Sequence, residues 1–451
     1  MGNLKGYINS LKGKRIAVIG AGVSNTPLIE LLRDANVDVT VRDKNESTEL
    51  SGVTLKLGED YLEDLSEDII FRTPGLMPSN PKIKSAVKNG SKLTSEMEVF
   101  FELCPCKIIA VTGSDGKTTT TSIIAELLKN SGKTVHLGGN IGTPLLYGVD
   151  SIAPDDIAVV ELSSFQLITM TSSPDIAVVT NLSPNHLDIH GDLEEYIEAK
   201  RNIYKYQKSD DIAVFNLDNE VTKKYSETAT AGDVRFFSRK KRVENGVYFE
   251  DGAIFSAKRG NSTELIKAED IQLPGAHNIE NYLAAFAAVR DMVGSEIMEK
   301  TAREFRGVAH RIELVREIGG VKFYNDSIAS SPSRTAAGLK SFDKKVILIA
   351  GGKDKGVAFD ELGALINKTV KKLILIGASA KLIETAVKSA KEYDAKLEIV
   401  MCDDLKKAVI AASKSAVSGD VVLLSPACTS FDMFKNFEER GNLFKSLVME
   451  L

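Results

Sequence analysis

The chain has 451 residues, a formal net charge of −5 and 26% charged residues of both signs. These totals leave no basic surface of the size that nucleic-acid binding needs, so we expect small-molecule partners and no nucleic acid. The length is enough for two or three domains, and we expect three. No N-terminal signal pattern precedes the first predicted strand and no apolar run is long enough to cross a membrane, so we expect a soluble protein without membrane insertion.

The four cysteines match neither a disulfide framework nor a zinc site. Two of them lie in Cys104-Pro-Cys106, where the separation differs from the Cys-x2-Cys spacing of zinc ligands and no second ligand pair follows. This cysteine usage fits a reducing, cytoplasmic setting.

The first predicted element is a βαβ unit of a doubly wound sheet. An apolar strand at residues 14–19 leads into Gly-Ala-Gly-Val-Ser-Asn at 20–25, and a helical pattern and a second strand, at 37–41, follow. Asn25 stands where the dinucleotide fingerprint needs glycine, which disfavours NAD. Asp43, at the end of the second strand, either accepts a hydrogen bond from a ribose or nucleobase or is a solvated turn residue. We favour a nucleotide-type ligand here.

A second loop is predicted at the same edge of this sheet. Residues 73–81 read Thr-Pro-Gly-Leu-Met-Pro-Ser-Asn-Pro and follow a predicted strand at 68–71. Because ligands of open parallel sheets gather at the carboxyl ends of the strands, this loop is a candidate for binding the same ligand. Its prolines are also typical of an ordinary loop.

We place a domain boundary near residue 106.

The strongest single motif lies just after that boundary. A predicted strand at residues 107–110 runs into Val-Thr-Gly-Ser-Asp-Gly-Lys-Thr-Thr-Thr at 111–120, and a helical pattern follows at 121–130. Backbone N–H groups of such a turn bind phosphate, Lys117 adds a positive charge, and the Thr118 hydroxyl can ligate Mg2+. The first glycine of the strict phosphate-loop spacing is missing, so a glycine-rich turn without a ligand stays the alternative.

Polar residues follow the next predicted strands of this second sheet. Glu161 comes directly after a strand at residues 157–160, and His186 lies in the loop after a strand at 176–180. Because the carboxyl ends of parallel strands meet at one edge, we expect both side chains to reach the phosphate loop and hold Mg2+ against phosphate oxygens. A lone histidine in such a loop more often has a structural or surface role, but its pairing with Glu161 and Lys117 favours the metal site.

Residues 220–270 are predicted to form antiparallel hairpins, because Asn-Gly, Asp-Gly and Arg-Gly turns separate segments that alternate charged and apolar residues. We assign them to packing and not to chemistry. An apolar helix is predicted at 281–289, and His277, Asn278 and Asn281 either cap it or contact an adenine edge.

The remainder of the chain, after a boundary near Gly307, is again predicted to be α/β. Its strands are expected at residues 346–350, 372–376, 397–400 and 421–424. Three α/β domains with facing clefts are typical of an enzyme that closes on its substrates. The expected domains are residues 1–106, 107–307 and 308–451.

Taken together, these motifs resemble those of the Mur ligases. The resemblance covers nearly the whole chain in order and spacing, through residues 112–118, 138–142, 161–166, 185–188 with Lys200, 273–278, 310–311, 325–327 and 425–432. The closing segment, residues 425–441, resembles that of the members that add D-glutamate. Folylpolyglutamate synthases share the fold and much of the ATP site, but the N-terminal βαβ unit argues against them.

The resemblance implies an α/β fold of three domains: a Rossmann-like N-terminal domain, a central phosphate-loop ATPase domain with a parallel sheet, and a C-terminal Rossmann-like domain. It implies a cytoplasmic ligase of peptidoglycan precursor and cell wall synthesis, on which cell shape, the cell cycle and cell division depend. ATP, UDP-N-acetylmuramoyl-L-alanine and D-glutamate would react through an acyl phosphate and a tetrahedral intermediate. Two Mg2+ ions and a monomeric enzyme are expected.

The resemblance also implies a role for each matching residue. ATP would be bound by Gly113, Ser114, Asp115, Gly116, Lys117, Thr118, Thr119, Asn278, Arg311 and Asp326. The UDP end of the substrate would meet Ser24, Asn25 and Asp43, and D-glutamate would meet Lys355, Ser430, Phe431 and Phe437. Asn140 would contact the muramoyl substrate or stabilise the intermediate. The metal ions would be held by Thr118, Glu161, His186 and Lys200.

Two positions need comment. In the family, the position of Lys200 is carbamylated by CO2, which turns a cation into a carboxylate-like metal ligand; from the residues alone we predict an ordinary exposed lysine of a helix. Residues 325–331 read Asn-Asp-Ser-Ile-Ala-Ser-Ser, so Ile328 replaces the lysine found in many D-glutamate-adding ligases. Our hypothesis is that Arg334 supplies this charge, which an unchanged turnover of Arg334→Ala would contradict; otherwise Arg334 faces solvent.

Three alternatives stay open. An amide ligase of the same architecture that adds another amino acid would differ only in the pocket of the last domain. An NAD-dependent oxidoreductase would use the first βαβ unit, but Asn25 and the phosphate loop count against it. A non-catalytic nucleotide-binding regulator would bind ATP without amino-acid-dependent hydrolysis, and the presence of Glu161, His186 and Lys200 disfavours it.

Overall fold

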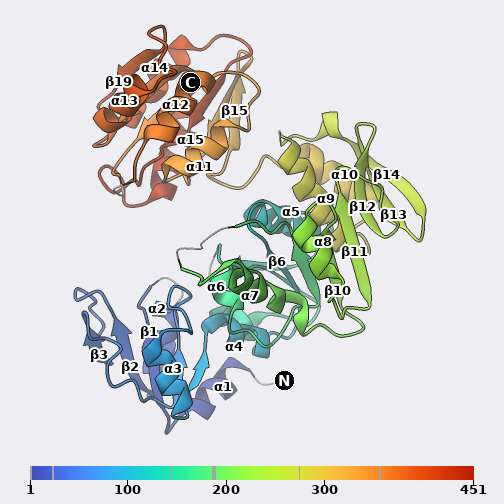
Figure 1. The fold of residues 1–451 in the computed structure, drawn as a ribbon, viewed down its shortest axis with the longest axis vertical. Coiled ribbons are helices and arrows are strands. Elements are labelled where there is room, and N and C mark those ends of the chain that lie inside the picture. The colour runs from blue at the N-terminus through green and yellow to red at the C-terminus, as the bar shows by residue number, and fades with distance from the viewer. Residues whose placement is uncertain (1–2, 23–24, 143, 185–188, 274, 355–356) are drawn as a thin grey trace. The chain divides into compact units, whose positions relative to one another are not determined.

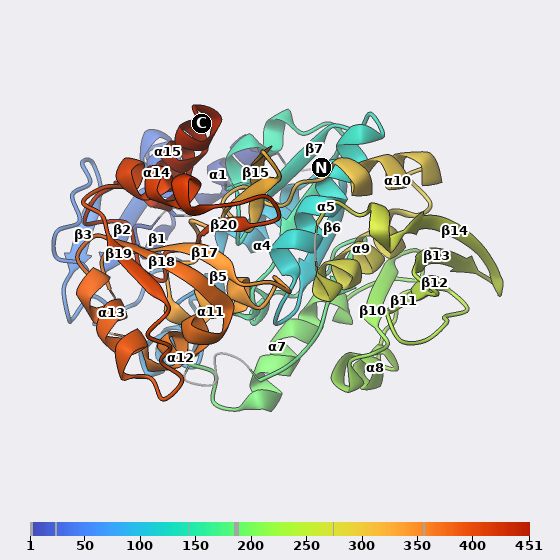
Figure 2. The ribbon, with the colours of Figure 1, turned by 90° about the horizontal axis from the view of Figure 1, so that it is seen from above.

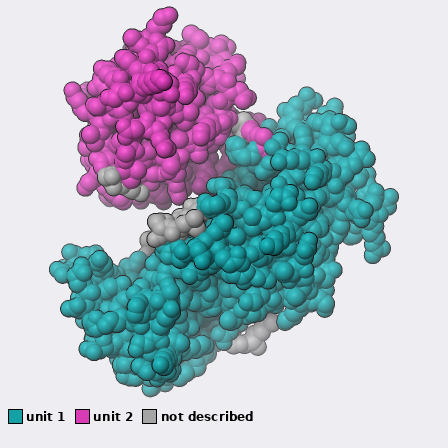
Figure 3. Space-filling view, viewed as in Figure 1, with its two compact units in different colours: residues 1–271, 277–303 teal, residues 272–276, 304–451 magenta. Residues whose placement is uncertain are grey.

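The computed structural model describes residues 3–22, 25–142, 144–184, 189–273, 275–354 and 357–451. Contacts divide the chain into two units, residues 1–271 with 277–303 and residues 272–276 with 304–451 (Figure 3). The first unit holds two sheets and the second unit holds one.

The first sheet has five parallel strands in the order β3-β2-β1-β4-β5 (Figure 1). The strands are β1 Arg15–Ile19, β2 Asp38–Asp43, β3 Thr54–Leu57, β4 Ile69–Phe71 and β5 Lys92–Thr94. The helices are α1 Leu4–Leu11, α2 Thr26–Asp34, α3 Pro81–Lys88 and α4 Glu96–Leu103. Strands β1 and β4 are almost entirely buried, as expected for central parallel strands covered on both faces.

The second sheet has nine strands in the order β14-β13-β12-β11-β10-β9-β6-β8-β7. The strands are β6 Lys107–Thr112, β7 Val135–Gly139, β8 Ile157–Glu161, β9 Ile176–Val179, β10 Ile212–Asn216, β11 Asp233–Ser238, β12 Gly246–Glu250, β13 Ala253–Lys258 and β14 Asn261–Lys267. The helices are α5 Lys117–Asn130, α6 Ser164–Leu167, α7 Leu193–Lys205, α8 Glu220–Ser226, α9 Ala276–Val289 and α10 Ser295–Glu304, with short 3-10 turns η1 Leu146–Ser151 and η2 Ala268–Asp270.

The first two sheets share one hydrophobic core, which explains why they form one unit. A single cluster of buried side chains runs from Leu4 to Phe215. Two hydrogen bonds cross the same junction: the Leu4 N–H donates to Asp150 (2.7 Å), and the Leu146 N–H donates to the Glu96 carboxyl (3.1 Å). Helices α1 and α4 therefore pack against η1 of the central region.

The prediction of hairpins throughout residues 220–270 is wrong in its first part. Residues 220–226 form α8, which Asn219 caps by accepting a hydrogen bond from the Thr222 N–H. Strand β11 pairs in parallel with both β10 and β12, because β10, α8 and β11 form a further crossover unit of the central sheet. The antiparallel pairs of this sheet are β12 with β13 and β13 with β14. These strands extend the sheet beyond β11 (Figures 1 and 2).

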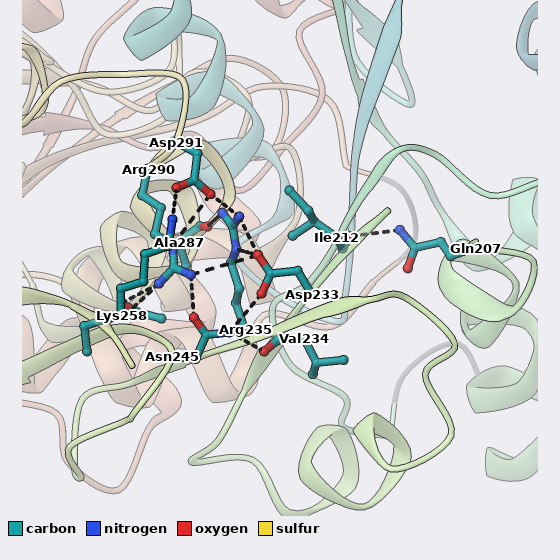
Figure 4. A network of polar contacts seen from close by, with 12 residues as sticks. Gln207, Ile212, Asp233, Val234, Arg235, Asn245, Lys258, Ala287, Arg290 and Asp291 are labelled. Carbon is teal, nitrogen blue, oxygen red and sulfur yellow. Dashed lines mark hydrogen bonds and ion pairs between the residues drawn. The ribbon is translucent and has the colours of Figure 1, made fainter. Parts of the chain in front are cut away.

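A buried polar network joins this extension to the end of α9 (Figure 4). Arg235 on β11 is 1% exposed; it donates to the Ala287 carbonyl (2.8 Å) and to Asp233 (2.8 Å), and also pairs with Asp291. Arg290 donates to the Ala257 carbonyl (2.6 Å). These bonds satisfy buried carbonyl groups and hold β11 and β13 against the helix.

The sheet of the second unit has six strands in the order β15-β16-β20-β17-β18-β19, all parallel except for β15 with β16. The strands are β15 Glu313–Ile318, β16 Val321–Asn325, β17 Val346–Gly351, β18 Val370–Ile376, β19 Glu398–Met401 and β20 Val421–Leu424. The helices are α11 Pro332–Leu339, α12 Asp360–Thr369, α13 Ala380–Ser389, α14 Leu405–Ser415 and α15 Phe437–Met449. Alternate residues of β17 enter two separate cores, Leu348 on one face and Ile347 on the other. Helices therefore cover both faces of this sheet.

The predicted α/β fold with three predominantly parallel sheets is confirmed. The domain boundaries at residues 106 and 307 stay predictions. Within the described ranges, no helix has the length and apolar character that crossing a membrane requires.

Candidate functional site

The phosphate-loop motif forms a turn between β6, which lies between β9 and β8 in the central sheet, and α5. Gly113 has φ of +150° and a Cβ atom there would lie 1.9 Å from the Thr180 hydroxyl oxygen. Gly116 has φ of +78°, and its Cβ would lie 2.4 Å from the Asn281 side-chain oxygen. Both glycines are therefore required by backbone conformation and by close neighbours. The N–H groups of Ser114 and Asp115 donate to the carbonyl and side-chain oxygens of Asn181 (2.8 and 3.0 Å), which fixes the course of the loop.

One side chain of the motif folds back onto the loop and another contacts α7. The Lys117 ammonium donates to the carbonyls of Gly113 (3.0 Å) and Ser114 (2.9 Å). The Ser114 hydroxyl lies 2.9 Å from the hydroxyl of Tyr196, on α7. Thr118 is buried in the first turn of α5. The loop is thus held on one side by α7 and carries a cation that can turn toward phosphate.

Glu161 and Asn140 meet beside this loop. Glu161 ends β8 and pairs with Val111 of β6 and with Gly139 of β7. The Asn140 side chain donates to Glu161 Oε1 (2.8 Å), and the Asn140 N–H donates to the Glu161 carbonyl (2.8 Å). Glu161 Oε2 is buried and has no hydrogen-bond partner among the described residues. A buried carboxylate oxygen without a partner is costly, and a metal ion or hydrogen-bond donor would compensate this cost.

Lys200 lies in the same site, and the prediction of an exposed lysine from the residues alone is wrong. Its side chain is 3% exposed and its amine donates to the Gly113 carbonyl (2.9 Å) and the Thr112 hydroxyl (3.2 Å). Burial, followed by repulsion from Lys117, holds the pKa of Lys200 well below its usual value, against the attraction of Glu161. Burial thus shifts the protonation equilibrium of Lys200 toward the uncharged amine, relative to an exposed lysine.

A helix pattern could have indicated this burial. Tyr196, Ile203 and Tyr204 are buried on α7, and position 200 is four residues from Tyr196 and three from Ile203. These spacings place Lys200 on the buried stripe of the helix.

The donors fit Mg2+. Thr118 and Glu161 offer oxygen atoms, which Mg2+ prefers, and Mg2+ usually takes only one or two protein ligands in addition to water and substrate phosphates. Over the described ranges, no three His, Cys, Asp or Glu side chains gather as a closed metal site. His186, the other predicted ligand, lies outside the described residues.

The first glycine turn, after β1, is shaped by two of the predicted substrate residues. Asp43 accepts hydrogen bonds from the N–H groups of Ala21 (2.7 Å) and Asn45 (2.8 Å). Asn25 is buried and donates to the Ile19 and Gly20 carbonyls, both at 3.0 Å. Each side chain therefore fixes the turn. Ser24 lies outside the described residues.

The start of α9 contacts the helix of the phosphate loop. Asn278 is buried, and its oxygen accepts a hydrogen bond from Asn281 (3.1 Å). Asn281 in turn accepts one from Thr120 on α5 (3.3 Å). The predicted adenine residue is thus joined by side-chain contacts to the phosphate loop.

In the second unit, Asp326 and Arg311 lie at the end of β16. Asp326 is buried and accepts hydrogen bonds from the Ser425 hydroxyl (2.7 Å) and the Ile312 N–H (3.3 Å). Burial raises the pKa of Asp326 to about 7, while the hydrogen bond from Ser425 and the positive charge of Arg311 act in the opposite direction. Arg334 is exposed on α11, yet its charge also acts on Asp326.

The predicted D-glutamate residues differ in exposure. Ser430 is buried, whereas Phe431 is 67% exposed. The ring of Phe437 packs edge-on against His310, with ring centres 5.9 Å apart. Lys355 lies outside the described residues.

Two buried side chains of the first unit were not singled out in the sequence. His190 lies 2.9 Å from the Ser164 hydroxyl and 3.1 Å from the Glu195 carboxylate, and stacks on the ring of Phe165. Arg72 donates to the Phe165 carbonyl. Neither residue belongs to a recognisable motif, and only their burial between elements distant in sequence reveals them.

Comparison with known proteins covers most of the chain. Residues 111–289 match the Mur ligase middle domain, and residues 310–428 match the glutamate ligase domain of Mur ligases. Two relatives are named UDP-N-acetylmuramoylalanine--D-glutamate ligase. The one from Ruminiclostridium cellulolyticum is 51% identical, over 99% of both chains, and the one from Acetivibrio thermocellus is 52% identical, over 99% of this chain and 98% of the relative.

Solved structures agree with the fold. The chain resembles UDP-N-acetylmuramate-alanine ligase MurC from Thermotoga maritima with a TM-score of 0.57 and 19% identity, over 97% of this chain and 99% of the other. It resembles the MurF ligase of Thermotoga maritima, solved in complex with ADP, with a TM-score of 0.54 and 18% identity, over 100% and 97% of the two chains. The site geometry, the matched domains and the full-length relatives together show that the chain belongs to the Mur ligase family.

Proposed function

We propose that the protein is an ATP-dependent ligase that adds D-glutamate to UDP-N-acetylmuramoyl-L-alanine, forming ADP and phosphate, in cytoplasmic peptidoglycan precursor synthesis. The observation that carries this proposal is the identity of about half of all residues, over essentially the full length, with relatives named for that reaction. The phosphate loop beside Glu161 and Asn140 supports the chemistry.

The proposed reaction concentrates negative charge at each step. The alanine carboxylate attacks the terminal phosphorus of ATP, the bond to ADP breaks, and the product is an acyl phosphate. The uncharged amine of D-glutamate then attacks the carbonyl carbon, and the tetrahedral intermediate loses phosphate and a proton to give the amide. Lys117 and the loop N–H groups would stabilise this growing charge. The Asn140 amide, held by Glu161 at 2.8 Å, would be positioned to bind the muramoyl substrate or the intermediate.

The substrate contacts stay proposals for each residue. ATP would be bound by Gly113, Ser114, Asp115, Gly116, Lys117, Thr118, Thr119, Asn278, Arg311 and Asp326, the UDP end by Ser24, Asn25 and Asp43, and D-glutamate by Lys355, Ser430, Phe431 and Phe437. We further propose that the domains are residues 1–106, 107–307 and 308–451 and that the enzyme is a monomer.

When bound, Mg2+ would neutralise phosphate charge and act as a Lewis acid. Thr118 and the unpartnered Glu161 Oε2 would hold one ion, with His186 and Lys200 at a second. The uncharged amine is the form that reacts with CO2 to give a carbamate and a proton. Burial lowers the pKa of Lys200 and so increases the share of this form, which supports carbamylation at this position.

The test is phosphate release from Mg-ATP and UDP-N-acetylmuramoyl-L-alanine with D-glutamate, L-glutamate, L-lysine, meso-diaminopimelate or no amino acid. We expect release with D-glutamate alone. Release with another amino acid would keep the reaction class and change the specificity. ATP binding without any release would instead favour a non-catalytic regulator, and a titration with nicotinamide cofactor tests the oxidoreductase alternative.

A further inference from the structure

Arg72 is a buried cation at the carboxyl end of β4, between two loops of the first unit. Its side chain is 1% exposed. No carboxylate among the described residues forms an ion pair with it. The negative charge of Glu98 acts on Arg72 from beyond Thr169, whose hydroxyl accepts a hydrogen bond from Arg72 and donates one to Glu98 (3.3 Å). Burial accordingly lowers the pKa of Arg72 to about 10, with Glu98 opposing.

The two ends of the guanidinium bind two different segments. Nη1 donates to the carbonyls of Pro74 (3.4 Å) and Leu76 (3.3 Å), in the loop that follows Arg72 itself. Nη2 donates to the Phe165 carbonyl (2.5 Å) and to the Thr169 hydroxyl (3.0 Å), at and just after α6. The planar side chain thus fixes the separation between a loop of the first sheet and a turn of the second.

Each segment adjoins one end of the proposed substrate site. A Cβ atom on Gly20, in the first glycine turn, would lie 3.0 Å from the Thr73 side chain, so the loop bound by Nη1 packs directly on that turn. Phe165 belongs to the turn that begins at Ser163, two residues after Glu161, and that the reciprocal Ser163–Gln166 capping box holds in place. Arg72 therefore links the loop that packs on the first glycine turn to the segment that follows Glu161.

A purely structural role does not account for an arginine here. Burying a cation without a bonded carboxylate costs free energy, and apolar side chains would pack this junction at lower cost. Only a guanidinium supplies donors in a fixed planar fork that can reach carbonyls of two loops at once; a lysine ammonium offers one point charge.

We propose that Arg72 is a positioning residue: it converts occupancy of the first glycine turn by the nucleotide end of the substrate into correct placement of the Glu161 turn, where the substrate carboxylate reacts. This inference rests on the proposed function for the identity of that substrate. Binding energy from a remote part of a substrate can be used in this way to order the reacting centre, so a substrate without its remote part loses rate as well as affinity.

The first test compares two substrates in wild type and in Arg72→Lys. One is UDP-N-acetylmuramoyl-L-alanine and the other is N-acetylmuramoyl-L-alanine, which lacks the nucleotide. In Arg72→Lys we expect the ratio of their kcat/KM values to fall by about tenfold or more, while the rate with the truncated substrate changes by less than about twofold. A variant that was merely less stable would lower both rates alike and leave the ratio unchanged, and that result would overturn the proposal.

Arg235→Lys is the matched control. Arg235 is equally buried in the same unit and also donates to a carbonyl, but its partners are confined to the network at the end of α9 (Figure 4). We expect this variant to be less stable and to keep the wild-type ratio of kcat/KM values. An equal change of the ratio in both variants would contradict a specific role of Arg72.

A second measurement does not depend on turnover. Amide hydrogen exchange is followed with and without UDP as the only added ligand, at 20–22 and at 163–169. In wild type we expect UDP to slow exchange in both segments, and in Arg72→Lys only in the first. Wild-type protein in which UDP leaves 163–169 unchanged would refute the coupling. Intact coupling in an enzyme that releases no phosphate with D-glutamate would leave the Arg72 inference standing and remove the proposed function instead.

Discussion

The amine of Lys200 is buried, and burial together with the nearby Lys117 disfavours its charged form. Its folded-state pKa is lowered, so the folded protein binds fewer protons than the unfolded chain at pH values between the folded and unfolded pKa. The contribution of Lys200 to stability therefore rises with pH through this window, and below the folded pKa the full cost of burying the cation applies.

Because burial lowers the folded-state pKa of Lys200, we predict that Lys200→Met is more stable than wild type in CO2-free buffer and that its advantage is larger at pH 6 than at pH 9. We also predict that its D-glutamate-dependent phosphate release is nearly abolished. Thermal unfolding and the phosphate assay measure the two effects. Lys205→Met, an exposed position at the end of the same helix, should change neither. A Lys200→Met variant that is destabilised at every pH would contradict the argument.

The contribution of Asp326 to stability depends on pH in the opposite direction to that of Lys200. Its folded-state pKa is raised from 3.8 to about 7 by burial, so the folded protein retains a proton that the unfolded chain has lost between about pH 4 and 7. Its contribution to stability is present below pH 4, decreases as pH rises through 7, and then stays constant.

We therefore predict that Asp326→Asn gains stability relative to wild type as pH rises from 5 to 8, by on the order of 2 kcal/mol, as measured by urea unfolding at both pH values. The exposed Asp360, in the first turn of α12, provides the control: Asp360→Asn should follow the wild-type pH profile. A constant difference between Asp326→Asn and wild type would show that the carboxyl does not titrate in this range.

At the scale of elements, α6 and α7 are joined by one imidazole. His190 bonds Ser164 of α6 and Glu195 in the first turn of α7, while its ring stacks on Phe165 at 5.0 Å and meets Tyr196 edge-on at 5.4 Å. The same helix α7 carries Lys200 to the phosphate loop. His190 thus holds together the elements that follow Glu161 and that bear Lys200.

We predict that His190→Ala lowers the free energy of unfolding by about 2–4 kcal/mol, because one buried hydrogen bond, one partly buried hydrogen bond and two ring contacts are lost and a cavity remains. The value of kcat should fall more than the KM for ATP rises, since the phosphate loop itself is intact. His136→Ala removes a partly exposed imidazole that bonds Asp156, and should cost about 1 kcal/mol or less. Equal losses in the two variants would contradict a joining role for His190.

Local patterns explain which parts of this site the sequence could predict. The phosphate loop is a contiguous turn whose glycines are required by its own backbone, so its strand, loop and helix follow from the residues. Glu161 follows from the rule for strand ends. The burial of Lys200 could also have been predicted, from its spacing to the apolar residues of α7. By contrast, the contacts of Arg72 span about a hundred residues of chain, so no local pattern predicts them. The Asn245-Gly246 turn signal was misleading because β11 and β12 pair in parallel.

At the scale of the whole molecule, the apolar strand patterns of the sequence predicted three sheets. The division into two units instead depends on the hydrophobic core that the first two sheets share. The first two sheets are joined by packing of α1 and α4 against η1, which involves apolar residues that are individually unremarkable in sequence. The third sheet has cores on both of its faces, formed within residues 304–451.

This organisation predicts that residues 304–451, expressed alone, fold to a cooperative unit. The fragment keeps both cores and loses only the short segment 272–276, whose Leu273 is buried and lies close to Gly307. Burial of a leucine side chain contributes about 2–3 kcal/mol, so the fragment should be less stable than the same unit in the full chain by about that amount. In the full chain, Leu273→Ala should lower the stability of this unit by a similar amount.

Asp326 provides an internal reporter for the fragment experiment, because the partners of its carboxylate among the described residues, Ile312 and Ser425, lie within residues 304–451. If the unit folds alone, urea unfolding of the fragment is a single transition, and Asp326→Asn reproduces in it the pH-dependent gain expected for the full chain. A fragment with a broad, non-cooperative transition, or with no effect of Asp326→Asn on its pH profile, would mean that the third sheet needs residues 1–303 to reach its native packing. The comparison thus tests at once the independence of the unit and the environment of its buried carboxyl group.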